Sequence, residues 1–163
     1  MPEKENIESV NRAIARFNAK DLDGYLEMFD KAVMFHGLSR RLKPGVGGLR
    51  DYYTHLREGF PDMRLASEDV FASGEKVANR YMFYGTHKGE YMGIAPTMKL
   101  VISSGMVINL FKSGKCVETW QSTDALGFLT QLGVVKPLSQ RRRTGGARKC
   151  LSPCKAPPPF FLA

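Results

Sequence analysis

The stretch KLVISSGMVINLFKSGKCVETWQST, residues 99–123, decides the fold class. Two runs rich in β-forming residues, 99–112 and 116–123, flank Ser113-Gly114-Lys115, a composition typical of a tight turn. The stretch therefore predicts two long antiparallel strands joined as a hairpin. Two further β-prone segments precede it, 63–71 and 77–86.

The rest of the chain has the spacing of helices. Apolar residues recur at helical intervals over 4–19, over a short segment that Asp21 caps and that reaches Phe29, over 46–58 and over 125–132. A brief apolar run, 31–36, predicts one early strand. Helices that come first and strands that follow favour an α+β fold. Long antiparallel strands can then curl around a helix and leave a cone-shaped cavity that is dry at its base.

The net charge of +8 is unevenly distributed. Residues 136–163 hold seven cations and no acid, whereas residues 1–135 hold 17 cations against 16 acids. The same tail contains five of the nine prolines and has no amphipathic period. We therefore expect one folded domain, 1–135, and a basic, proline-rich, disordered tail, 136–163. Nucleic-acid binding would rest on the tail alone, so no nucleic-acid partner is predicted.

Composition excludes several other classes. No apolar run reaches the roughly 18 residues of a membrane-spanning helix, and the polar start of the chain does not resemble a secretory signal. Three cysteines cannot all pair within one chain, which favours a reducing, cytoplasmic setting. The three scattered histidines do not form a metal-binding pattern. We predict no metal and no cofactor.

Four motifs occur in order along the chain: PGVGGLRDYY (44–53), Phe60-Pro61-Asp62, GTHKGEYMGIAPTMK (85–99) and WQSTDALGFLTQLG (120–133). Together they resemble the SnoaL-like polyketide cyclases of the NTF2-like superfamily, over about residues 5–135. The resemblance implies a cone of three N-terminal helices packed on a curved, mostly antiparallel sheet. It also implies a homodimer formed through the outer face of the sheet.

The resemblance implies a chemistry as well. The family's cyclases close a ring by intramolecular aldol condensation without metal or cofactor, and related proteins isomerise steroids, open epoxides or only bind partners. Fold alone does not choose among these activities. We predict a cofactor-independent acid/base enzyme acting on a small carbonyl compound, with ring closure of a polyketide-like ester as its reaction. The alternatives are a non-catalytic module that binds a hydrophobic small molecule, or an epoxide hydrolase or ketosteroid-isomerase-like enzyme.

Asp124 matches the general acid/base aspartate of these cyclases. An exposed aspartate, with a pKa near about 3.9, is a weak base for a proton on carbon, whereas a dry pocket raises the pKa toward neutrality. Alternation puts Trp120 and Asp124 on one strand face, so Trp120 is expected to shape the same pocket. The alternative is that Asp124 only caps the final helix.

Four more residues complete the predicted site. His87 matches the family's usual histidine and would bind the substrate carbonyl or orient the aspartate, unless it is purely structural. His36, Tyr53 and Phe83 are expected to contact substrate, although aromatic residues at such spacing also build cores. The family's cyclases carry polar side chains where this chain has Ile108 and its neighbour Leu110. If those two face inward, Asp124 lacks a polar partner.

Overall fold

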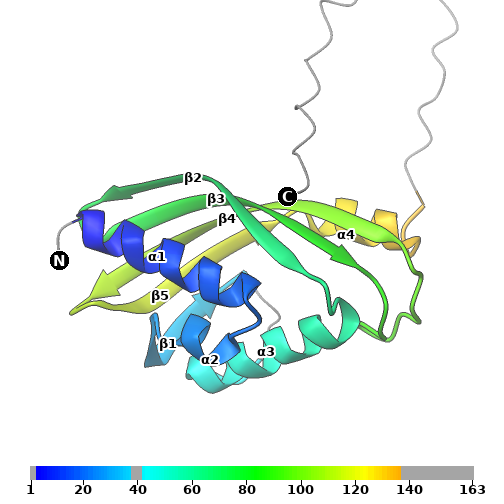
Figure 1. The fold of residues 1–163 in the computed structure, drawn as a ribbon, viewed down its shortest axis with the longest axis horizontal. Helices are drawn as coiled ribbons and strands as arrows, with labels where there is room; N and C mark the ends of the chain where they lie inside the picture. The colour runs from blue at the N-terminus through cyan, green and yellow to red at the C-terminus, as the bar shows by residue number, and fades with distance from the viewer. Residues whose placement is uncertain (1–2, 38–41, 137–163) are drawn as a thin grey trace, which may run out of the picture.

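The computed structural model describes residues 3–37 and 42–136 (Figure 1). Its elements run in the order α1 (Glu3–Asn18), α2 (Leu22–Leu26), β1 (Phe29–His36), α3 (Gly45–Gly59), β2 (Arg64–Ser73), β3 (Lys76–Thr86), β4 (Leu100–Lys112), β5 (Lys115–Thr123) and α4 (Ala125–Leu132). Within this part of the chain no helix is long and apolar enough to cross a membrane. The tail predicted to be disordered lies outside the described residues from position 137 onward.

The five strands form one curved sheet in the order β1-β5-β4-β3-β2, and α1, α2 and α3 lie along its concave face (Figure 1). Strands β2 to β5 pair antiparallel with their neighbours, while β1 pairs parallel with β5. The α+β fold and the hairpin over 99–123 are therefore confirmed. The prediction for Phe29 is wrong, because this residue begins β1 instead of ending the second helix. Phe29 pairs with Cys116 of β5, and the backbone amide of Cys116 donates to Met28 O at 2.8 Å.

The core lies between α1, α3 and the sheet. Helix α1 buries Val10, Ala13 and Phe17, which recur at helical spacing, against the sheet. At its C-terminal end, Asn18 accepts a hydrogen bond from Leu65 N and donates one to Leu65 O, both at 2.8 Å. This pair of bonds fixes the helix against β2 and sets the width of the space beneath it.

A bulge in β5 decides which residues face that space. Leu110 pairs with Glu118 and Phe111 with Cys116, so β5 carries one extra residue between two consecutive positions of β4. Before the bulge, Cys116 is buried. Beyond the bulge, Thr119, Gln121 and Thr123 are the residues of β5 that face inward. Alternation on β4 turns Asn109 inward and leaves Ile108 43% exposed on the outer face. The inward residues of β4 and β5 that line the cavity therefore include the polar side chains of Ser103, Asn109, Thr119, Gln121 and Thr123.

Candidate functional site

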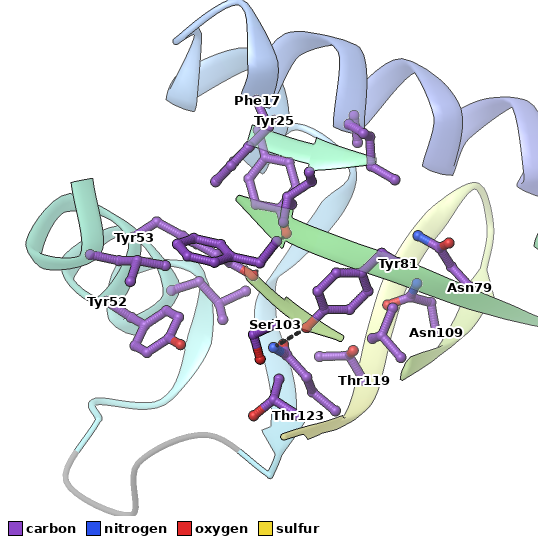
Figure 2. A pocket seen from close by; sticks show the side chains of 18 of the residues that line it. Phe17, Tyr25, Tyr52, Tyr53, Asn79, Tyr81, Ser103, Asn109, Thr119 and Thr123 are labelled. Atoms are coloured by element: carbon purple, nitrogen blue, oxygen red, sulfur yellow. Dashed lines mark hydrogen bonds between the residues drawn. The ribbon is translucent and has the colours of Figure 1, made fainter. Parts of the chain in front are cut away.

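A cavity of about 220 Å³ lies between the helices and the concave face of the sheet. Its walls differ in character, as Figure 2 shows: aromatic rings from α1, α2 and α3 face polar side chains from β3, β4 and β5. A cavity of ~150 Å³ accommodates one benzene, so this one has room for a compound of two fused rings. No Asp, Glu, His, Lys or Arg is among the described residues that line it.

The aromatic wall is a packed cluster. Phe17, Tyr25 and Tyr53 meet edge to face, with ring centroids 5.0–5.5 Å apart, and the Tyr25 and Tyr53 hydroxyls share a hydrogen bond of 3.0 Å. Burial raises the pKa of Tyr53 well above its ordinary value. Tyr53 and Phe83 both line the cavity, where the sequence analysis expected them. The tyrosines here stay protonated near neutrality and act as hydrogen-bond donors or acceptors, not as bases.

The polar wall comes from alternate residues of three strands. Gln121 donates from Nε2 to the hydroxyl of Tyr81 at 2.7 Å (dashed in Figure 2), and burial raises the pKa of Tyr81 to about 12. Gly105 stands directly opposite Tyr81, and a side chain there would collide with its ring. The remaining polar residues on these strands that line the cavity are Asn79, Ser103, Ser104, Asn109, Thr119 and Thr123. This set was not predicted, although inward residues recur with a period of two along each strand of the sequence.

Asp124 lies at the rim of the cavity and not inside it. Its side chain is exposed and accepts a hydrogen bond from Gly127 N at 2.8 Å, which caps α4. The dry surroundings expected for this carboxyl are therefore absent. The residues on either side of it, Thr123 and Ala125, do line the cavity, and Ser103 Oγ lies 3.5 Å from the Asp124 carbonyl oxygen.

His87 is fully buried behind the cavity wall. Its ring stacks on Phe60 at 5.1 Å, and Thr97 N donates to Nδ1 at 3.2 Å. Backbone bonds to Lys99 O and from Met98 N, both of 2.9 Å, close the loop that follows β3. Because Nδ1 accepts, the proton of the neutral ring is on Nε2. His87 is not among the cavity-lining residues, and its position is that of a structural histidine holding this loop.

The stability of the folded protein should decrease as the pH is lowered, because of His87. Burial lowers the pKa of His87, so the folded protein keeps the ring neutral while the unfolded chain takes up a proton below about pH 6.5. Stability is then lost as pH falls from that value, by at most about 1.4 kcal/mol per pH unit. Urea unfolding between pH 7.5 and 5.5 measures this slope.

In His87→Gln, the free energy of unfolding should depend less steeply on pH than in the wild-type chain. His55→Gln is the control, since His55 is exposed and its Nδ1 bonds Asp51 O at 2.8 Å. An unchanged slope in His87→Gln would contradict the assignment of the pH dependence to this ring.

His36 and Trp120 lie on the outer face of the sheet. Their rings stack with centroids 5.5 Å apart, and His36 Nε2 bonds Glu118 Oε1 at 2.8 Å. Lys76 Nζ lies 5.5 Å from the Trp120 ring centroid on the same face. Both residues were expected to contact substrate, and neither lines the cavity. For Trp120 the physical reason is the parity change at the β5 bulge, and His36 lies on β1 directly opposite Trp120. In the described residues, no group of three or more His, Cys, Asp or Glu could hold a metal ion.

Comparisons with known proteins agree with this geometry. A family model described as SnoaL-like polyketide cyclase matches residues 8–132. Among solved structures, AclR from Streptomyces galilaeus, a proposed hydroxylase, is 25% identical with a TM-score of 0.74, covering 82% of this chain and 98% of its own. IdmH from Streptomyces antibioticus, a proposed polyketide cyclase, is 26% identical with a TM-score of 0.68. The match covers 79% of this chain and 99% of IdmH. No curated protein matches the chain.

Proposed function

The chain belongs to the SnoaL-like polyketide cyclase family, and we propose that it is a cofactor-independent acid/base enzyme whose substrate occupies the cavity. The substrate is a small, neutral, ring-bearing carbonyl compound, and ring closure by intramolecular aldol condensation is the proposed reaction. The observation that carries this proposal is the cavity itself, with an aromatic wall facing a wall of amide and hydroxyl groups. Tyr53 and Phe83 contact the substrate's apolar surface.

The proposed base is Asp124. With Thr123 and Ala125 lining the cavity, its backbone belongs to the rim, and a rotation of the side chain away from Gly127 N would bring the carboxylate toward bound substrate. The carboxylate would take a proton from the carbon next to a carbonyl. The resulting enolate carbon would form the new bond to a second carbonyl, whose oxygen takes the proton back from Asp124. The polar wall supplies donors for the charge that develops on oxygen.

Proton abstraction can be tested without the natural substrate. α-Tetralone, a neutral two-ring ketone, should exchange its α-protons for deuterium faster with the protein than in buffer, as followed by proton NMR in D2O. Serine and asparagine also cap helices well. Asp124→Ser and Asp124→Asn should therefore keep the wild-type melting temperature but lose roughly a hundredfold of the enzyme-dependent exchange.

Asp124→Ala is the matched comparison for the cap. It should lose the exchange and also about 1 kcal/mol of stability, because Gly127 N is left without its acceptor. If Asp124→Ser exchanges protons as fast as the wild-type protein, Asp124 is only a cap and the proposed mechanism fails.

A second candidate function is a small-molecule binding module without turnover. The capping geometry of Asp124 favours it, as does the absence of any carboxylate or histidine among the described lining residues. The same feature argues against epoxide hydrolysis, which needs acidic groups facing the substrate to activate water. Binding of α-tetralone with no exchange above buffer would select this candidate.

The outer face of the sheet is the proposed homodimer interface. It carries exposed apolar side chains on β1, β2 and β4: Met34, Phe71, Ile102, Met106 and Ile108. Monomeric proteins rarely expose large apolar patches, so these side chains favour a contact with a second copy of the chain. The stack of His36 on Trp120 would lie within the contact. A cytoplasmic setting remains part of the proposal.

A further inference from the structure

Asn79 lines the cavity and has a buried hydrogen-bond acceptor that no described group uses. The residue is only 3% exposed, it lines the cavity, and its Oδ1 has no partner among the described residues. Figure 2 places it at the polar end, beside Tyr81 and Asn109. A buried carbonyl oxygen without a donor costs about 1–3 kcal/mol, so its presence in a site that can hold a ligand needs an explanation.

The neighbouring polar groups do not supply the missing donor. The amide of Gln121 is used by the Tyr81 hydroxyl at 2.7 Å. Across the sheet Asn79 is paired with Val107, whose side chain has no polar atom. Asn109 stands diagonally from Asn79, and its own Oδ1 takes the thiol of Cys116 at 3.7 Å. Asn79 Oδ1 is thus a buried acceptor at this end to which no described group donates.

The absence of charged side chains from the described lining of the cavity limits which ligands it can bind. With no cation among its described lining residues, a carboxylate or phosphate would be buried here without a counter-charge. The aromatic wall and the volume of about 220 Å³ favour a flat apolar body. A neutral ligand with a hydroxyl or N–H at its leading end satisfies both conditions.

We propose that Asn79 is a specificity-determining residue that accepts a hydrogen bond from a hydroxyl at the inner end of a neutral, two-ring ligand. The inference rests on the proposed function only in taking the same cavity as the binding site, and it does not depend on catalysis. The hydroxyl is recognised as a donor, so its methyl ether, which has the same rings and no O–H, is discriminated against.

The test compares three probes by isothermal titration calorimetry: β-naphthol, its methyl ether and β-naphthoate. The wild-type protein should bind β-naphthol about tenfold more tightly than the methyl ether, the value of one buried hydrogen bond. The naphthoate should bind most weakly. Equal affinities for naphthol and methyl ether, or tightest binding of the naphthoate, would overturn the proposal even if Asp124 proves catalytic.

Asn79→Leu, similar in shape but without the acceptor, should erase the preference by weakening naphthol binding about tenfold while leaving the ether unchanged. Asn6→Leu is the matched control, because Asn6 is equally buried with an unpartnered Oδ1 but does not line the cavity. A preference kept in Asn79→Leu, or lost in Asn6→Leu, would assign the selectivity elsewhere. If Asn79→Leu does not fold, the wild-type selectivity still decides.

The outcomes separate this inference from the enzymatic one. Selective binding of β-naphthol together with no α-proton exchange keeps the role of Asn79 and rejects the acid/base mechanism. Exchange that depends on Asp124, without selectivity among the naphthyl probes, does the reverse. If none of the three probes binds, the assignment of Asn79 is rejected along with the cavity as a ligand site.

Discussion

Replacing Phe60 by alanine is expected to lower the free energy of unfolding by about 3–5 kcal/mol, enough to reduce the melting temperature by roughly 10 °C or more. Phe60 is fully buried at the end of α3. Its ring lies 5.1 Å from that of His87 and 5.5 Å from those of Phe83, Tyr91 and Phe128. One side chain therefore joins α3, β3, α4 and the loop after β3, and its loss leaves a cavity that these elements cannot close together.

Differential scanning calorimetry measures this effect, and Leu126→Ala is its control. Leu126 is 60% exposed on α4, outside the proposed dimer interface, so truncating it to alanine should cost under about 1 kcal/mol. Similar losses from the two substitutions would contradict the description of Phe60 as the point where these elements meet.

Introducing a charge at Ile108 should dissociate the proposed homodimer. Ile108 is 43% exposed on the outer face and pairs across the sheet with Trp120. In a two-fold symmetric dimer both subunits contribute the same surface, so the substituted residue occurs twice in the interface. Burying an unpaired carboxylate costs several kcal/mol per copy, so Ile108→Glu should weaken association roughly a thousandfold or more.

Light scattering should then give twice the chain mass for the wild-type protein and the single mass for Ile108→Glu. Trp120 is the only tryptophan, so its emission should shift to the red as this face becomes hydrated. Asn11→Glu places the same charge on the exposed side of α1 and should leave the dimer intact. A wild-type chain of monomer mass would reject the proposed interface.

Related proteins with this fold carry different proposed activities. IdmH is a proposed cyclase and AclR a proposed hydroxylase, although each covers about four-fifths of this chain. In this protein the inward positions of β3, β4 and β5 carry the polar groups, and each can change without altering the strand. We therefore expect the side chains at these inward positions, Asn79 among them, to determine which ligand the cavity binds.

Local patterns in the sequence were sufficient for the elements and the fold class. The helical spacing of Val10 and Phe17, the turn at Ser113-Gly114-Lys115 and the cap at Asp124 are properties of neighbouring residues. Such patterns act over a few positions, so they can be read along the chain. The order of the motifs added the family, which the match over residues 8–132 confirms.

Only the tertiary structure decided which faces form the cavity. Alternation along β5 groups Trp120 with Ser122, and Thr119 with Gln121, but it cannot say which group points inward. The extra residue in β5 beyond Cys116 makes that choice, and it exists only in the pairing of β5 with β4. A shift of one residue exchanges the two faces of a strand. It turned Trp120 outward and brought Thr119, Gln121 and Thr123 to the cavity.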